Sequence, residues 1–285
     1  EAGADLIVGA HPHILQGAGW RQDTPVLYSL GNFWFNMETV DTALLTVTLT
    51  GPGAENATVR LIPCIQTGGR TDTVQYYSHW LLRRFEEGYV LVRNPRYPHL
   101  VTRYDLSPDK VDCVVFCSKD YRPILPRLHE VTDRFPAYFF YTITAYGKDV
   151  EPGVPPIEAG METLKALSAQ VGRQRVAWRY DPVLLTKDYT IPRHLETFEA
   201  MARELAPFVD KCIFSFVEMY RKLAVNMPEL RPVSPAQRQE LAAGLGAIAA
   251  RYGMPLQICG TDQDFSRYGI RPSGCMTLET LGKAN

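Results

Sequence analysis

The sequence lacks several features that would point directly to a function. It contains no apolar run that approaches the ~18 residues needed to span a bilayer. Its 30 Lys and Arg balance 31 Asp and Glu, so the net charge of -1 attracts neither nucleic acid nor a membrane surface. Neither G-x-G-x-x-G nor G-x-x-x-x-G-K-S/T occurs, so nucleotide binding through those phosphate-binding loops is not indicated.

Closely spaced cysteines are also absent. The six cysteines are spread along the chain without a C-x-x-C pair, which argues against a zinc knuckle and a thioredoxin-type redox site. Most of them lie in apolar, strand-like runs, so we interpret them as reduced, buried thiols. We therefore expect a cytoplasmic protein.

Strands and helices alternate along most of the chain. From residue 67 onward, strands are predicted at 110–118, 137–145, 174–180, 211–217 and 255–259, and helices at 76–87, 123–135, 157–171, 192–205 and 235–252. This alternation predicts an α/β fold with a mainly parallel sheet. We interpret it as an irregular or partial TIM-type barrel over 67–285, preceded by a small β-rich segment over 1–66. An open doubly wound sheet is the alternative.

A polar group follows the strand at the centre of this region. In Arg175-Val-Ala-Trp-Arg-Tyr-Asp-Pro182, apolar Val176 and Trp178 give way to Arg179 and Asp181. Pro182 cannot donate to a sheet ladder, so the strand is expected to end there. The carboxyl ends of barrel strands carry the chemistry, which makes Arg179, Asp181 and Lys119 candidate catalytic residues. The alternative is an Arg–Asp pair that only fastens the loop.

Other polar residues follow the remaining strands or turns. We interpret these as substrate-binding candidates: Arg70, Asp72, Tyr146, Ser215, Glu218 and Asp262. Guanidinium groups bind planar acidic groups through two parallel hydrogen bonds, so the set suits a polar or anionic small molecule. The alternative is a network of loop salt bridges.

Two histidines, His11 and His13, follow the first predicted strand. Two histidines this close can face one metal ion, although such a pair is more often a polar loop. Gly9-Ala-His-Pro-His-Ile-Leu-Gln16 and Tyr28-Ser-Leu-Gly-Asn-Phe33 resemble the end of the CapA family of capsule-biosynthesis proteins. The resemblance implies a calcineurin-like metallophosphoesterase fold, metal binding by both histidines, and a cell-envelope location. We expect only a half-site with little or no hydrolytic activity, because two-metal chemistry needs more ligands.

A second resemblance covers residues 67–285. The segments Gly69-Arg-Thr-Asp72, Val111-Asp-Cys-Val-Val-Phe-Cys-Ser-Lys119, Tyr146-Gly-Lys-Asp-Val-Glu-Pro152 and Trp178-Arg-Tyr-Asp-Pro182, together with Cys275, resemble the bacterial family called domain of unknown function eighteen-forty-eight. The resemblance implies a radical-SAM-like protein with an iron–sulfur cluster and S-adenosylmethionine. Closely spaced cysteines do not follow Cys275 here, so we expect this chain as given to bind no stable cluster.

Three functions from different classes remain open. The main domain is a radical-SAM-like enzyme relative that is inactive or incomplete as given. Alternatively, the chain is a metal-dependent phosphoesterase-like protein of capsule (poly-gamma-glutamate) biosynthesis. The third possibility is a non-catalytic module that binds a small anion or a partner protein. The two resemblances meet near residue 66, which suits a fusion or a fragment spanning a join.

Overall fold

A computed structural model gives the fold. It describes residues 7–8, 18–21, 24–27, 40–49, 57–66, 72–93 and 99–284, the last range without 220–222, 224–226, 228–229 and 274–276. The chain divides into two compact units, Glu1–Thr71 with Leu91–Tyr104, and Asp72–Val90 with Asp105–Asn285. None of the helices in the described ranges is long and apolar enough to cross a membrane.

The first unit contains short sheets. Strand β3 (Thr24–Leu27) pairs with β1 (Ile7–Val8) in parallel and with β2 (Ala18–Arg21) in antiparallel orientation. Strands β4 (Val40–Leu49) and β5 (Ala57–Gln66) form an antiparallel pair, as the alternating sequence predicts. Strands β6 (Tyr89–Arg93) and β7 (Val101–Asp105) form a further two-stranded sheet.

The second unit is built on a six-stranded parallel sheet. Its strands are β8 (Val114–Ser118), β9 (Ala137–Thr142), β10 (Val176–Val183), β11 (Lys211–Phe216), β12 (Leu256–Ile258) and β13 (Ile270–Pro272). They lie side by side in chain order, and every neighbouring pair is parallel. The predicted α/β class is confirmed. The sheet is open, with β8 and β13 at its edges among the described strands, so a closed barrel is not seen.

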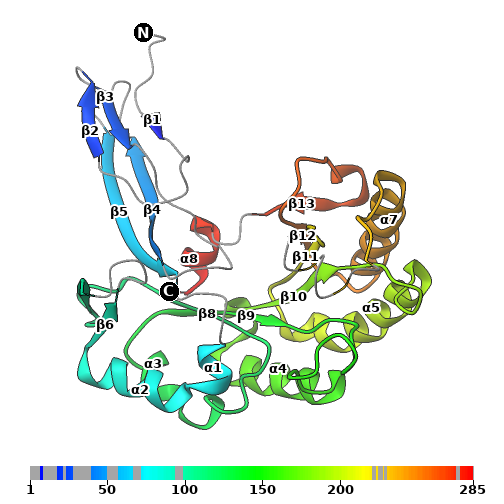
Figure 1. The fold of residues 1–285 in the computed structure, drawn as a ribbon, viewed down its shortest axis with the longest axis horizontal. Helices are drawn as coiled ribbons and strands as arrows, with labels where there is room; N and C mark the ends of the chain where they lie inside the picture. The colour runs from blue at the N-terminus through cyan, green and yellow to red at the C-terminus, as the bar shows by residue number, and fades with distance from the viewer. Residues whose placement is uncertain are drawn as a thin grey trace. The chain divides into compact units, whose positions relative to one another are not determined.

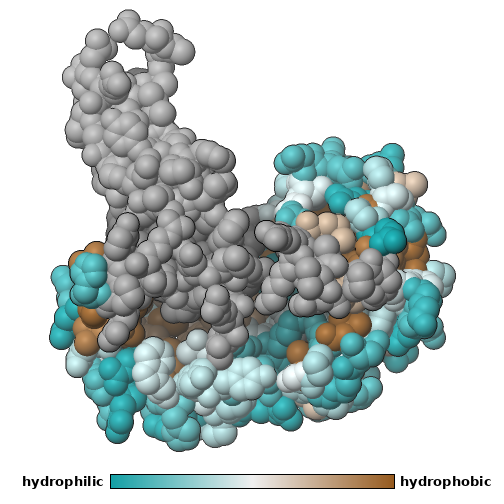
Figure 2. Space-filling view, in the orientation of Figure 1, coloured by the Kyte–Doolittle hydropathy of each residue, from teal (hydrophilic) through white to brown (hydrophobic). Residues whose placement is uncertain are grey.

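One face of this sheet is covered by helices. Helices α4 (Ile157–Val171), α5 (Ile191–Leu205) and α7 (Pro235–Arg251) connect successive strands (Figure 1). Successive residues of a strand point to opposite faces, and Phe139, Trp178 and Phe214 pack with these helices in one buried core. Toward solvent, the described surface visible along the lower margin of Figure 2 is mainly hydrophilic.

The alternate strand residues form a second face. Tyr138, Phe140, Ala177, Ile213 and Cys259 make a separate cluster there, and helix α8 (Leu278–Ala284) adds Ala284 to it. Lys283 of α8 contacts both carboxylate oxygens of Asp210, at 2.8 and 2.9 Å. This ion pair between Lys283 and Asp210 lies at the amino end of β11. The carboxyl ends of the strands on the second face are therefore a different region from the one that Lys283 contacts.

Local sequence signals explain several element boundaries. Ser234 accepts from Gln237 N while the Gln237 side chain accepts from Ser234 N, and these two hydrogen bonds form a capping box at the start of α7. Helix α2 (Ser78–Glu87) ends at Gly88, whose φ of 77° suits glycine. The short helix α1 (Thr73–Tyr76) precedes it, capped by the Asp72 carboxylate at 2.9 Å.

Three predictions differ from the structure. Instead of one helix over 123–135 there are two short ones, η2 (Leu125–Arg127) and α3 (His129–Thr132), because Pro126 provides no N–H for a helical bond. Strand β10 continues through Pro182 to Val183, and a register shift after Tyr180 accommodates the proline. Strand β13 was not predicted, since three residues give no readable periodicity.

Candidate functional site

Arg179 lies at the centre of the candidate site. Its Nε donates to Asp181 Oδ1 at 2.9 Å and its Nη2 to Oδ2 at 2.6 Å, so the guanidinium fork is held by the carboxylate. Nη2 also donates to Cys259 Sγ at 3.6 Å, and the guanidinium lies 5.6 Å from the ring centre of Phe140. One side chain thus contacts groups from β9, from β10 and from the end of β12.

The alternation of side chains along β10 decides which face of the sheet Arg179 and Asp181 point to. Trp178 and Tyr180 belong to the helix-covered core, so Arg179 and Asp181 point to the second face. Tyr180 is paired with Phe214, and Phe214 with Ile258. Ser215 and Cys259 follow the paired residues Phe214 and Ile258 on neighbouring strands, whereas the register between β10 and β11 shifts after Tyr180. The structure therefore brings together the predicted residues Arg179 and Asp181 and places Cys259 and Phe140 beside Arg179.

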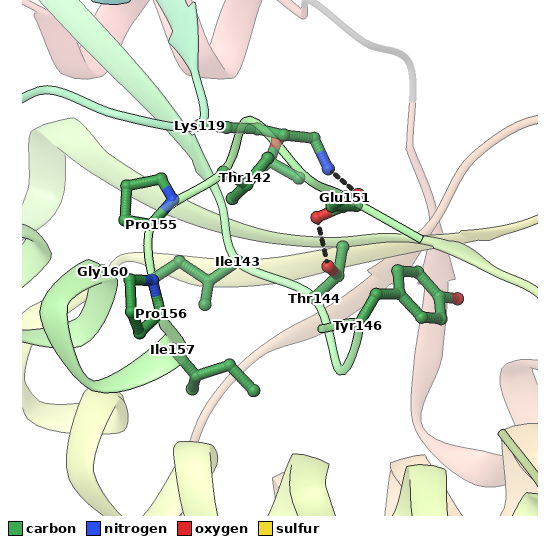
Figure 3. Close-up of a pocket in the computed structure, with 11 residues that line it drawn as sticks. Lys119, Thr142, Ile143, Thr144, Tyr146, Glu151, Pro155, Pro156, Ile157 and Gly160 are labelled. Atoms are coloured by element: carbon green, nitrogen blue, oxygen red, sulfur yellow. Dashed lines mark hydrogen bonds and ion pairs between the residues drawn. The ribbon is translucent and has the colours of Figure 1, made fainter. Parts of the chain in front are cut away.

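A second cluster follows β8. Lys119 Nζ forms an ion pair with Glu151, and Glu151 Oε2 accepts from Thr144 Oγ1 at 2.9 Å (Figure 3). Asp72 Oδ2 accepts from Ser118 Oγ at 2.5 Å and from Lys119 N at 3.0 Å. The predicted residues Lys119 and Asp72 thus lie together, and both are engaged by protein groups.

The cavity beside Lys119 is small. Its volume is about 10 Å³, and Pro155, Pro156 and Ile157 form part of its wall. Such a volume admits one water molecule at most. Lys119 and Glu151 therefore neutralise each other beside a packed wall.

Two tyrosines join the loops that follow β9 and β10. The Tyr146 hydroxyl donates to Pro182 O at 2.7 Å and accepts from Leu184 N at 2.8 Å. From the loop after β10, the Tyr189 hydroxyl accepts from Gly147 N at 2.8 Å and donates to Asp149 Oδ1 at 2.8 Å, and both partners lie in the loop after β9. The two rings meet edge to face, with centres 5.0 Å apart.

The contacts of Tyr146 fit a positioning role. It is buried, and burial raises the pKa of its hydroxyl. Both sides of the hydroxyl are used by the backbone around Pro182, one residue beyond Asp181. The substrate-binding role predicted for Tyr146 stays a prediction, and in this structure its hydroxyl is engaged by Pro182 O and Leu184 N.

His194 contacts the same loop through a hydrogen bond to its backbone. Its Nε2 lies 2.8 Å from Leu184 O and its Nδ1 lies 2.8 Å from the Tyr180 hydroxyl. A carbonyl can only accept, so Nε2 carries the proton and Nδ1 accepts from Tyr180. The ring is fully buried, and this desolvation lowers the pKa of His194.

The lowered pKa of His194 predicts a pH-dependent stability. The unfolded state takes up a proton near the ordinary pKa of ~6.5, whereas the folded state resists protonation. The stabilisation is therefore complete above about pH 6.5 and is lost as the pH falls below it. We expect the urea-derived free energy of unfolding to fall from pH 7.5 to 5.5, and to fall less steeply in His194→Gln. An equal slope in both proteins would contradict this role.

The remaining predicted residues are less closely grouped. Glu218 and Asp262 are exposed, and Glu218 lies over Gly260, where a Cβ would be 3.7 Å from Oε1. Arg70, His11 and His13 lie outside the described residues. Glu151 and Phe140 were not among the predicted site residues, because their roles depend on contacts between distant segments.

The described residues do not fit an iron–sulfur cluster, which needs at least three thiolates close together. The cysteines whose side chains the structure describes are Cys113, Cys117, Cys212 and Cys259. Cys212 belongs to the helix-covered core, and three strands separate Cys117 on β8 from Cys259 after β12. No group of three or more His, Cys, Asp or Glu that could hold a metal ion occurs within these described ranges.

The two parts of the chain match different families of known proteins. Residues 1–37 match the model of "Bacterial capsule synthesis protein PGA_cap". Over 48 residues the chain is 48% identical to the PGA biosynthesis protein CapA of Bacillus subtilis and to the capsule biosynthesis protein CapA of Bacillus anthracis. The match covers 16% of this chain and only 13% and 12% of those two proteins. No solved structure matches.

The larger part of the chain matches a single family model. That model is described as "Domain of unknown function (DUF1848)" and matches residues 64–285, which is more than three quarters of the sequence. The matched range contains all six strands of the parallel sheet together with Arg179, Asp181 and Cys259. The chain therefore belongs to the DUF1848 family.

Proposed function

We propose that the second unit binds a small polar molecule with an acidic group at the carboxyl end of its parallel sheet. Arg179 is the central binding group. The proposal rests on the contacts of this one side chain with β9, β10 and the end of β12, on the face opposite the helices α4, α5 and α7. Ligands of parallel α/β sheets bind outside the carboxyl ends of the strands.

The contacts around Arg179 hold its guanidinium in a fixed orientation before a ligand binds. Asp181 fixes the plane of the guanidinium, and Tyr146 fixes the backbone beyond Asp181. A positioned guanidinium loses little freedom when it binds a carboxylate or phosphate. We further infer that the six sequential strands are the wall of a partial barrel, because that strand order brings their carboxyl ends to one opening.

Binding of succinate and inorganic phosphate tests this proposal. We expect saturable binding by isothermal titration calorimetry that weakens about tenfold in Arg179→Lys, which keeps the charge and loses the fork. Asp181→Asn should bind both anions more tightly, because it removes the carboxylate that competes for Arg179. Arg251→Ala, on an exposed ion pair of α7, is the matched control and should bind like the wild type. Absence of binding, or equal affinity in Arg179→Lys, would overturn the proposal.

A second candidate function comes from the similarity of residues 1–37 to capsule synthesis proteins. We infer that His11 and His13 contribute to a divalent-metal site, as histidine is a common ligand of such ions. Two histidines are fewer than a complete ligand set, so no hydrolytic step is assigned to them. Manganese binding that disappears in His13→Ala and persists in His99→Ala would support this site. Unchanged binding in His13→Ala, or none in the wild type, would refute it.

A further inference from the structure

A surface hollow lies beside α2, apart from the residues discussed so far. Its volume is about 500 Å³, within the range of small-molecule sites. Helix α2, labelled in Figure 1, provides one wall with His79, Trp80, Arg83 and Glu86, and Arg127 of η2 provides the other. His79, Arg83 and Glu86 are spaced by four and three residues, so they follow one stripe of the helix.

The contacts of Arg127 orient the donors of this hollow. Its Nε and Nη2 donate to the two carboxylate oxygens of Glu130, at 2.5 and 2.9 Å, which fixes the guanidinium. Its Nη1 lies 3.1 Å from His79 Nδ1. A guanidinium only donates, so His79 Nδ1 accepts here and Nε2 carries the ring proton. His79 thus presents an N–H donor.

Trp80 supplies an aromatic surface. Its side chain is 46% exposed although indole is among the largest apolar groups. The guanidinium of Arg84 lies 5.8 Å from the ring centre and is itself held by Glu87 at 2.7 Å. A supported, exposed indole can stack on a flat ligand.

Arg83 supplies a mobile positive charge on the same helix. Its side chain is 72% exposed, and its ion pair with Glu87 is long, at 4.0 Å. Such exposed pairs are weak, so the guanidinium can turn toward a ligand at little cost. The lining side chains include two guanidinium groups and one carboxylate, Glu86.

We propose that this hollow binds a planar aromatic molecule that carries one acidic group. The ring stacks on Trp80, and the acidic group accepts hydrogen bonds from Arg83 and from His79 Nε2. All of the lining residues within the described ranges belong to α2 and η2, so none of them is shared with the cluster around Arg179.

Three probes distinguish the parts of this proposal. We expect 1-naphthoate to bind with a Kd below about 1 mM. It should bind at least about tenfold more tightly than 1-naphthylamine, which lacks the acidic group, and than cyclohexanecarboxylate, which cannot stack. Isothermal titration calorimetry with the whole chain measures all three.

Variants locate the binding. Trp80→Ala and Arg83→Ala should each weaken 1-naphthoate binding about tenfold, while Arg251→Ala should leave it unchanged. Both exposed residues of α2 can be replaced without loss of folding, which circular dichroism checks. No binding of 1-naphthoate, equal binding of the three probes, or wild-type affinity in Trp80→Ala would overturn the proposal.

Discussion

Replacement of Trp178 by alanine is expected to lower the free energy of unfolding by about 3–5 kcal/mol, as for other large buried aromatic residues. Trp178 is fully buried on β10 and stacks on Phe198 of α5, with ring centres 5.0 Å apart. Its indole Nε1 donates to Ile143 O at 2.9 Å, so the substitution also leaves a buried carbonyl without its donor. Urea denaturation followed by circular dichroism measures the change.

Trp178→Phe separates packing from hydrogen bonding. Phenylalanine keeps an aromatic ring against Phe198 but has no donor for Ile143 O, so we expect an intermediate loss. The exposed Trp80 is the matched control, because Trp80→Ala should change the stability by less than about 1 kcal/mol. A loss in Trp178→Ala as small as that in Trp80→Ala would contradict the central position of β10 in the core.

Replacement of Asp181 by alanine is expected to cost about 3 kcal/mol of stability, because it leaves the guanidinium of Arg179 largely buried without its carboxylate. The side chains of Arg179 and Asp181 are only 12% and 15% exposed. An exposed pair behaves differently, since solvent screens each charge. Thermal and urea unfolding give the loss directly.

The ion pair between Arg251 and Glu199 is the control for this prediction. Its side chains are 61% and 38% exposed, so Glu199→Ala should cost less than about 1 kcal/mol. The double variant Arg179→Met with Asp181→Leu should recover part of the loss, because it removes both charges together. Equal losses in Asp181→Ala and Glu199→Ala would show that Asp181 does not hold Arg179 in solution.

Features set by neighbouring residues could be predicted from the sequence. The helix at Ile157–Val171 has the predicted bounds, and the capping box at Ser234 and the terminating Gly88 depend on interactions within one turn. The parallel sheet followed from repeated alternation of strands and helices. An Arg179–Asp181 pair was predicted only as the alternative to a catalytic role, and the two side chains meet because they are two apart on one strand.

Features set by distant segments could not be predicted. Glu151 reaches Lys119 across 32 positions and Cys259 reaches Arg179 across 80, and no local pattern encodes either contact. The hydroxyl of Tyr146 could not be assigned to the backbone near Pro182, because that contact depends on how two loops pack. The course of β10 past Pro182 depends likewise on its pairing with β11.

Hydrogen exchange with and without succinate tests the binding role of Arg179 most directly. Mass spectrometry would follow residues 176–183 and 256–262, which carry Arg179, Asp181 and Cys259, and compare them with α7 as an internal reference. We predict that succinate slows exchange in both segments, that α7 is unaffected, and that the effect is lost in Arg179→Lys. Succinate binding that protects neither segment, or that protects them equally in Arg179→Lys, would contradict a ligand site at the carboxyl end of this sheet.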